Sequence, residues 1–274
     1  MGTAVKTSEI LTSEENHTNE IRQLENEIAH LEQLLEQKDD ELETYLHILS
    51  HEIKTPIVTI QGYASLLQDS FGELLPEDGE RFIQGILNNV GRLEVLVKDL
   101  LTLSGIRINP EEFTLVDLNE LVEDILIDLY GAYQFAPETI KITENMPVVI
   151  GHRDSLRHVY TNLIVNSIKY CNDKVPLKIE VGCSFDEFFP KFFVKDNGVG
   201  VPSSARKKIF DMFGRAGNKK NVSGTGIGLV IVQKIVEAHG GEIWLESKRG
   251  KGTTFYFTLP TEKSQNVSQK NYLS

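Results

Sequence analysis

A long repeating stripe of hydrophobic residues near the start of the chain limits what this sequence can fold into. The hydrophobic positions alternate in steps of three and four, as on a helix that packs along a partner in a coiled coil. A continuous helix from about residue 20 to 68 would be on the order of 70 Å long, more than a small domain can cover. We therefore predict a coiled coil over residues 20–45 that joins a homodimer, with a single solvated helix as the alternative. The positions of the stripe are Ile21, Leu24, Ile28, Leu31, Leu35, Leu42, Tyr45 and Leu49.

Charge and cysteine content narrow the possible functions. The 274 residues include 28 Lys and Arg against 40 Asp and Glu, a formal net charge of -12. We therefore expect no nucleic acid as a partner and no membrane contact from this chain itself. Cys171 and Cys183 lack CxxC spacing, so neither a disulfide framework nor a zinc site is indicated. These features fit a cytoplasmic protein, or the cytosolic portion of a larger sensor.

A second helical stripe predicts an antiparallel hairpin over residues 46–106. The first stripe continues from Ile53 to Leu67 with a break in its heptad spacing, and Pro56 lies within it. We expect a loosened helix one turn after His51, which acts either as a mechanical joint or only as a packing feature. Two such hairpins would form a four-helix bundle across the dimer. The second stripe, after a connection of about ten residues, contains Ile83, Ile86, Val90, Leu93, Val97 and Leu100.

A compact set of reactive side chains lies on the first of these helices. His51 is followed at once by Glu52, and Thr55 is four residues further on. An imidazole can act as a nucleophile, a neighbouring carboxylate can support its second ring proton, and a hydroxyl can orient water. We predict that His51 accepts a phosphoryl group. A solvated helical histidine is the alternative.

The second half of the chain predicts a two-layer α/β sandwich over residues 113–261, after a linker at 107–112. Short strands are expected at 113–116, 140–143, 148–150, 177–184, 191–195, 242–247 and 253–259. Helices are expected at 118–133, 154–170, 204–210 and 226–239, with Asp117 as a helix N-cap. Strands mixed with a few helices favour a sandwich over an alternating doubly wound sheet. The polar ends, 1–19 and 262–274, are expected to be disordered.

One of the predicted helices carries a row of polar residues. Asn162, Asn166 and Lys169 share a face because residues three or four apart in a helix are neighbours. Amide oxygens can bind Mg²⁺ that keeps water and ligand phosphate in its shell, and the ammonium can pair with phosphate. An ordinary solvated face is the alternative.

The segment from Asp196 to Gly200 follows a hydrophobic strand. Asn-Gly at 197 and 198 indicates a turn. The turn alone does not explain the carboxylate at the end of the strand, which is placed to accept a hydrogen bond from an adenine amine. The glycines would allow a ligand to approach closely.

A glycine-rich segment, Gly224 to Leu229, opens another predicted helix. Glycines at a helix N-terminus leave backbone N–H groups free to bind phosphate. The spacing is neither a Walker A motif nor GxGxxG. The loop from Gly214 to Gly224 contains Lys219 and Lys220, and it could close over a triphosphate.

Taken together, these motifs resemble those of the sensor histidine kinases of two-component signalling, over about residues 40 to 260. The resemblance rests on Ser50–Pro56 as the phosphoacceptor box, Asn162–Tyr170 as the N box and Asp196–Gly200 as the first glycine box. It also includes Phe210–Phe213 with Arg215 as the F box, and Gly224–Leu229 and Gly250–Thr253 as later glycine boxes. Ser167 departs from the family pattern, where Ala is usual.

The resemblance implies the ATP-binding fold shared with gyrase-type ATPases and heat-shock chaperones. It assigns Asn166 to Mg²⁺, Asn162 and Lys169 to phosphates, Asp196 to adenine, and the amides from Gly224 to Gly228 to phosphates. The matching boxes add to the expected nucleotide-binding residues Tyr170, Gly198, Gly200, Arg215, Thr225, Gly226, Leu229 and Thr253.

The sequence thus predicts an ATP-dependent protein-histidine kinase. It would phosphorylate His51 and pass the phosphoryl group to an aspartate in the receiver domain of a response regulator, and Thr55 could support the reverse dephosphorylation. Two alternatives are a non-kinase protein whose conformation is gated by ATP and a coiled-coil adaptor. Neither gives His51 and Glu52 a task.

Overall fold

The computed structural model describes residues 2–106, 109–133, 135–143, 146–172, 174–185, 190–214 and 224–260. The chain divides into two compact units, Met1–Glu52 and Ile53–Ser274. Helix α1 (Gly2–Phe71) starts in the first unit and ends in the second. Helix α1 begins at Gly2, so residues 2–19, which were expected to be disordered, are helical. Once a helix is nucleated, each further residue adds a hydrogen bond, so a polar segment without proline can extend it.

Helix α1 continues through Pro56, so the loosening expected one turn after His51 does not interrupt the helix. A proline removes only its own N–H, which leaves the Glu52 carbonyl without its usual helical donor. The next turn is held in place, because Ile57 is 3% exposed and the Thr59 hydroxyl donates to the Thr55 carbonyl at 3.0 Å. Among the described helices, none combines the length and hydrophobicity needed to cross a bilayer.

The hairpin is completed by α2 (Glu77–Ser104), after a short 3₁₀ turn at Gly72–Leu74. The connection is shorter than expected because Glu77, Asp78 and Glu80 lie in the first turn of α2, where carboxylates interact favourably with the helix dipole. The predicted stripes are partly buried, at Ile57, Ala64, Ile83 and Val90.

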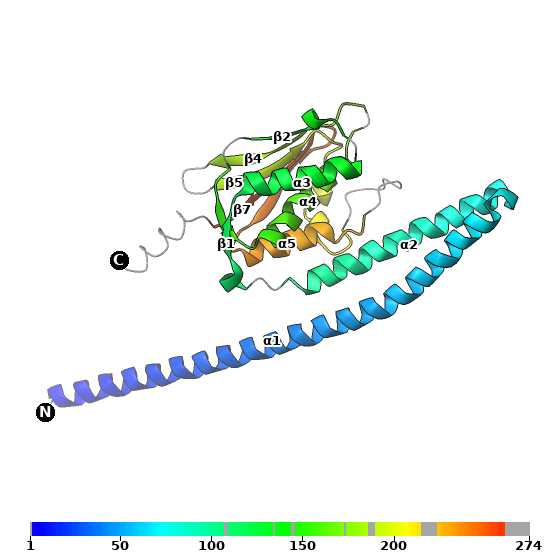
Figure 1. Ribbon diagram of the computed structural model, residues 1–274. Helices are drawn as coiled ribbons and strands as arrows, with labels where there is room; N and C mark the ends of the chain where they lie inside the picture. The colour runs from blue at the N-terminus through cyan, green and yellow to red at the C-terminus, as the bar shows by residue number, and fades with distance from the viewer. Residues whose placement is uncertain are drawn as a thin grey trace. The chain divides into compact units, whose positions relative to one another are not determined.

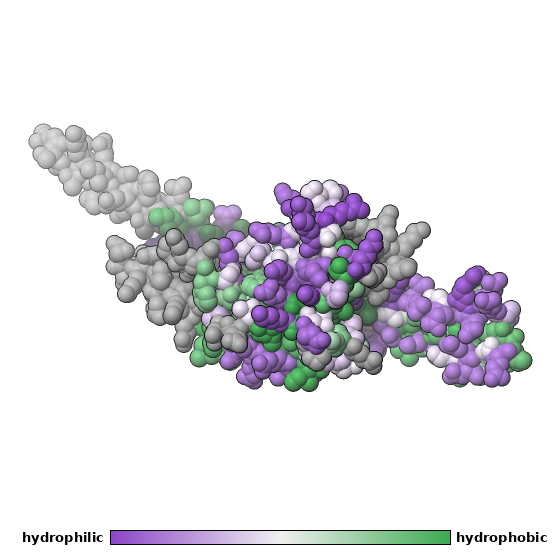
Figure 2. Space-filling view, turned by 90° about the horizontal axis from the view of Figure 1, so that it is seen from above, coloured by the Kyte–Doolittle hydropathy of each residue, from purple (hydrophilic) through white to green (hydrophobic). Residues whose placement is uncertain are grey.

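Much of the rest of the two stripes stays exposed in a single chain. Figure 2 shows hydrophobic residues interrupting the hydrophilic surface along the hairpin. Exposed hydrophobic side chains of this region include Ile53, Ile60, Leu67, Ile86 and Leu93. A hairpin that leaves so many apolar residues in water has a face that a second helical pair could cover.

The second half of the chain forms the predicted α/β sandwich (Figure 1). The main sheet has the order β2-β4-β5-β7-β6, in which β2 is parallel to β4 and the remaining neighbours are antiparallel. A separate pair joins β1 to β3. The strands are β1 (Thr114–Val116), β2 (Ile140–Ile142), β3 (Val149–Gly151), β4 (Ile179–Phe185), β5 (Pro190–Asp196), β6 (Ile243–Lys248) and β7 (Gly252–Thr258).

Three helices cover one face of this sheet (Figure 1): α3 (Leu118–Tyr133), α4 (Arg153–Lys169) and α5 (Gly228–Ala238). The core between the layers includes Tyr160, which meets Phe257 edge-on at 5.4 Å, and Phe192, which stacks on Phe257 at 5.6 Å. Packed aromatic rings of this kind bury large areas, so they fix α4 firmly against β5 and β7.

Local expectations within the sandwich are met with two differences. Asp117 caps α3, since its Oδ1 accepts from the Asn119 N–H at 2.8 Å. The helix expected at 204–210 is instead two 3₁₀ turns, Ser203–Ala205 and Lys208–Phe210. Helix α4 is capped by the His152 side chain, which accepts from the Ser155 N–H, and so begins before Asp154.

A buried histidine ties α5 to the strand pair. His239 is 3% exposed and stacks on Phe113 at 4.8 Å. Its Nδ1 lies 2.8 Å from the Ile235 carbonyl, and its Nε2 accepts from the His152 N–H at 3.0 Å. This pairing requires a neutral ring. Burial lowers the pKa of His239, the nearby His152 ring lowers it further, and the bond to Ile235 opposes the change.

We expect the sandwich to lose stability at mildly acidic pH because of His239. The unfolded chain takes up a proton on this ring near its ordinary pKa of 6.5, whereas the folded chain does so only at lower pH. Stability is therefore fully present above about pH 6.5 and falls as pH drops toward the lowered pKa. Urea unfolding followed by the fluorescence of Trp244, the single tryptophan, measures this. The slope of the free energy of unfolding against pH should shrink in His239→Gln. It should persist in His47→Gln, whose ring is exposed.

Candidate functional site

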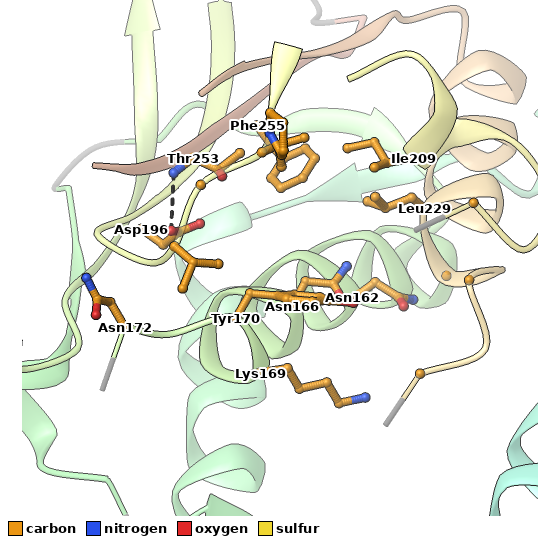
Figure 3. A pocket seen from close by; sticks show the side chains of 18 of the residues that line it. Asn162, Asn166, Lys169, Tyr170, Asn172, Asp196, Ile209, Leu229, Thr253 and Phe255 are labelled. Atoms are coloured by element: carbon orange, nitrogen blue, oxygen red, sulfur yellow. Dashed lines mark hydrogen bonds between the residues drawn. The ribbon is translucent and has the colours of Figure 1, made fainter. Parts of the chain in front are cut away.

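The sandwich contains a cavity of about 810 Å³ beside α4, next to the end of β5 and the start of α5 (Figure 3). The structure brings most of the predicted ligand-binding residues together around it. Gly198 is not in its lining but donates to Asp196, and Arg215, Lys219 and Lys220 lie outside the described residues. The predicted residues that line the cavity are Asn162, Asn166, Lys169, Tyr170, Asp196, Gly200, Gly224, Thr225, Gly226, Gly228, Leu229 and Thr253.

The polar row of α4 lies along one wall (Figure 3). Asn162 is held in place, since its Nδ2 donates to the His158 carbonyl at 3.1 Å and its Oδ1 lies where a side chain on Gly228 would collide with it. Within the described part of the chain no hydrogen bond occupies the Asn166 amide. An amide oxygen that faces the cavity suits a hard cation. The Lys169 ammonium, three residues further along α4 and without a described ion-pair partner, suits phosphate.

Asp196 forms the opposite wall, at the end of β5 (Figure 3). Its Oδ1 accepts from the Gly198 N–H at 2.7 Å and from the Thr253 N–H at 3.2 Å. Burial raises the pKa of Asp196, and these two N–H groups and the Ser167 hydroxyl act against that rise. The arrangement fixes one carboxylate oxygen and leaves the other available to a ligand that donates a hydrogen bond.

Two glycines make close backbone approaches in this site. Gly252 has φ +100, and a side chain there would overlap the Asp196 carbonyl. Gly226 has φ +77, and a Cβ there would come within 2.8 Å of the Phe213 backbone. The Phe213 N–H donates to the Gly226 carbonyl at 3.1 Å, so the described residues on either side of 215–223 are joined by a backbone hydrogen bond.

The N-terminus of α5 faces the cavity, as the glycine-rich segment predicted. The Ile227 N–H donates to the Thr225 hydroxyl at 3.3 Å, and that hydroxyl donates to Asp99 of α2. Asp99 and Val95 line the cavity as well. No sequence pattern indicated these two residues, because they belong to the hairpin and reach the cavity only through tertiary packing.

Other lining residues were also missed. Lys174 and Arg249 add positive charge, and Ile209 and Phe255 add apolar surface on which a flat ring could stack. Phe255 could have been found, because the inward positions of β7 alternate with outward ones. Lys174 and Arg249 stand in loops and match no spacing rule.

The reactive set on α1 is open to solvent. The side chains of His51 and Glu52 are 79% and 77% exposed, and His51 Nδ1 lies 4.0 Å from a Glu52 carboxylate oxygen. Thr55 is exposed as well. A phosphoacceptor must be reachable by a separate donor domain and by a partner protein, so exposure fits the predicted role.

A cavity lined by an amide on α4, a glycine-rich helix start and a fixed carboxylate is typical of an ATP-binding domain, here in a chain whose helical hairpin bears an exposed histidine. Residues 151–263 match the family of histidine kinase-, DNA gyrase B- and HSP90-like ATPases, and residues 41–107 match the His Kinase A phosphoacceptor domain. The chain belongs to the sensor histidine kinases of two-component signalling.

Several curated proteins are similar to most of this chain. The chain is 35% identical over 240 residues to phytochrome-like protein Cph1 of Synechocystis, covering 88% of this chain and 32% of Cph1. It is 31% identical over 242 residues to the sensor histidine kinase WalK of Bacillus subtilis, covering 84% and 38%. The chain therefore spans about a third of the length of these relatives. The crystal structure of full-length ShkA in complex with AMPPNP has the same fold, with a TM-score of 0.57 at 24% identity, covering 78% of this chain and 45% of ShkA.

The lack of space for a side chain at Gly226 gives a prediction for nucleotide binding. In Gly226→Ala we expect ATP to bind more than tenfold more weakly, because the new methyl group would displace the Phe213 backbone beside the start of α5. Gly240→Ala is the matched control, since Gly240 has φ +73 but open space around it. It should lose about 1 kcal/mol of stability from its positive φ and keep its affinity for ATP. Calorimetric titration measures the affinity of each variant for ATP. Equal affinities in the two variants would contradict the effect expected at Gly226.

Proposed function

We propose that this chain is an ATP-dependent kinase that phosphorylates His51 and then passes the phosphoryl group to an aspartate of a response regulator. The observation that carries the proposal is the meeting of Asn166, Asp196 and the start of α5 around one cavity, in a chain that also exposes His51 beside Glu52. The whole protein's activity, substrate and partner are inferred from these sites and from the family.

We place ATP with its base against Asp196 and its phosphates near Asn162, Lys169 and the start of α5. The free amide of Asn166 would hold Mg²⁺, which would neutralise charge on the phosphates during transfer. Ile209 and Phe255 would contact the base, and Lys174 and Arg249 add to the cationic surroundings of the bound nucleotide. Residues 214–224, if they close as a lid, would exclude water.

The transfer step follows from the chemistry of the imidazole. Nδ1 of His51 lies 4.0 Å from a Glu52 carboxylate oxygen, and the other ring nitrogen, Nε2, would attack the γ-phosphorus in line. The new N–P bond forms as the bond to the bridging oxygen breaks and ADP leaves. Glu52 would stabilise the proton on Nδ1, or accept it. Positioning and charge neutralisation supply most of the rate enhancement in such transfers.

We propose a homodimer as the working form. The apolar stripe from Ile21 to Leu49 and the exposed residues of the hairpin are the surfaces that a second copy would cover. A bundle of two hairpins would place two copies of His51 on its outside. Sedimentation equilibrium of the chain would remove this part of the proposal if it gave a monomer at micromolar concentration.

Thr55 would act in the reverse direction, by orienting a water molecule that hydrolyses the phosphorylated regulator. It lies one turn after His51 on the same exposed face. A Thr55→Ala variant that dephosphorylates the regulator as fast as the unchanged protein would remove this role.

Labelling with γ-³²P ATP tests the kinase activity. We expect label that is lost in acid and kept in alkali, absent from His51→Gln and retained in His47→Gln, a matched exposed histidine one turn earlier. Asn166→Asp should also lose at least 90% of the label, because a carboxylate changes the charge at the metal site. Labelling of His51→Gln as strong as that of the unchanged protein would show that His51 is not the acceptor and would overturn the proposal. Binding of ATP without any label on the unchanged protein would instead favour a non-kinase protein gated by ATP.

A further inference from the structure

A polar residue near the end of β6 lies next to the wall of the cavity. Ser247 is half-buried, and along the strand it follows Ile243 and Leu245, which pack against the hydrophobic core of the sandwich. It lies directly across from Thr253 of β7, which is 6% exposed and lines the cavity. Ser247 itself is not among the described residues that line the cavity, and the nucleotide-binding boxes assigned from the sequence do not include it.

The Ser247 hydroxyl makes hydrogen bonds to two separate segments of the chain. Its Oγ accepts from the Val201 N–H at 2.7 Å and donates to the Gly252 carbonyl at 2.8 Å. The Thr253 hydroxyl lies 3.0 Å from the same oxygen. A serine hydroxyl has one proton and two lone pairs, so while its proton is on Gly252 it accepts from both Val201 and Thr253. Every hydrogen-bonding position of the Ser247 hydroxyl is then used.

The backbone of the turn after β6 packs against the same segment. The Gly250 N–H donates to the Val199 carbonyl at 2.7 Å. A Cβ on Gly200 would lie only 2.4 Å from the Lys248 carbonyl oxygen, so the two backbones approach as closely as a glycine allows. The turn after β6 and the segment after β5 are therefore tightly packed, and the Ser247 side chain joins them to β7.

The segments that Ser247 joins both contribute to the wall of the cavity. Gly200 and Val201 line it, and so does Thr253, whose N–H also donates to the Asp196 carboxylate at 3.2 Å. A group that fixes two parts of a binding site relative to each other lowers the cost of binding, because less freedom is lost when the ligand enters. Without the Ser247 hydroxyl, the Val201 N–H would lose its described acceptor.

We propose that Ser247 is a positioning residue for nucleotide binding, which acts through Val201 and Thr253 and does not touch the ligand. Its hydroxyl holds the segment after β5 and the start of β7 in one arrangement, so that the cavity has its binding shape before the nucleotide enters. We expect it to affect nucleotide affinity and not the transfer step, because Ser247 makes no described contact with Asn166 or His51. The proposal rests on the proposed ATP site.

Ser247→Ala in the full chain tests the proposal, with Thr258→Val as the matched control. The Thr258 hydroxyl accepts from the Glu242 N–H at 3.0 Å at the other end of the same strand pair, and Thr258 is not among the described residues that line the cavity. Each variant removes one hydroxyl that accepts from a backbone N–H. We expect Ser247→Ala to bind Mg·ATP about tenfold more weakly, the effect of one neutral hydrogen bond at the upper end of its usual contribution. Thr258→Val should bind it as the unchanged protein does, and calorimetric titration measures both affinities.

Three further measurements separate positioning from a purely structural role. In His51 labelling, the KM for ATP should rise about tenfold in Ser247→Ala, while the rate at saturating ATP stays within about twofold. Ser247→Thr, which keeps a hydroxyl, should restore most of the affinity. In a double-mutant cycle with Thr253→Val, the two effects on affinity should be less than additive, because each change removes one member of the same hydroxyl pair.

An unchanged ATP affinity in Ser247→Ala would overturn the proposal, while His51 labelling of the same preparation would leave the proposed function intact. Equal weakening in Ser247→Ala and Thr258→Val would also overturn it, because a general loss of stability would then explain both. If Ser247→Ala did not fold, Ser247→Cys, with a weaker donor of similar size, would replace it in the same comparison. If the unchanged protein bound no ATP at all, both the proposed function and this inference would fail.

Discussion

The site depends on one half-buried carboxylate, that of Asp196, and the two backbone N–H groups that hold it. Asp196 can be placed inside the sandwich only because the Gly198 and Thr253 N–H groups offset part of the cost of its burial. Those donors come from the turn after β5 and from the start of β7, so they meet only when the two strands pair in the observed register. Gly252 lets them approach, since any side chain there would overlap the Asp196 carbonyl.

The opposite wall is organised by the packing of a single helix. Tyr160 and Leu163 bury one face of α4 in the core, and this directs Asn162 and Asn166 toward the cavity (Figure 3). The 3.6-residue period of α4 therefore determines both which side chains enter the core and which face the cavity. His51, the proposed phosphoacceptor, has a different environment. It is exposed on a long helix, where a donor domain and a regulator could reach it.

Much of the fold could be predicted from the sequence, because local patterns determine elements. The strand and helix positions from Thr114 to Thr258 followed from hydrophobic period and capping residues such as Asp117. The predictions that differ from the structure share a cause. Each of these segments depends on its packing environment, which the hydrophobic periodicity of the sequence does not show. Pro56 was tolerated because the neighbouring turn is packed, and the 3₁₀ turns near Ile209 replaced a helix because the segment lies between the core and the cavity. Helix α1 extends back to Gly2 because the helix formed by the hydrophobic stripe from Ile21 onward continues toward the N-terminus.

The sequence by itself determined which chemistry was possible. The order of Asn166, Asp196 and the glycines before α5 indicated phosphate and metal binding, and the pair His51 and Glu52 indicated a phosphoryl acceptor, because side-chain type and helical spacing are properties of the chain alone. Only the tertiary structure decided which atoms meet. The hydrogen bond from the Thr253 N–H to Asp196 joins residues 57 positions apart, and the bond from Thr225 to Asp99 joins residues 126 positions apart. Contacts of that kind depend on strand register and on the packing of helices against a sheet, and no local pattern in the sequence encodes them.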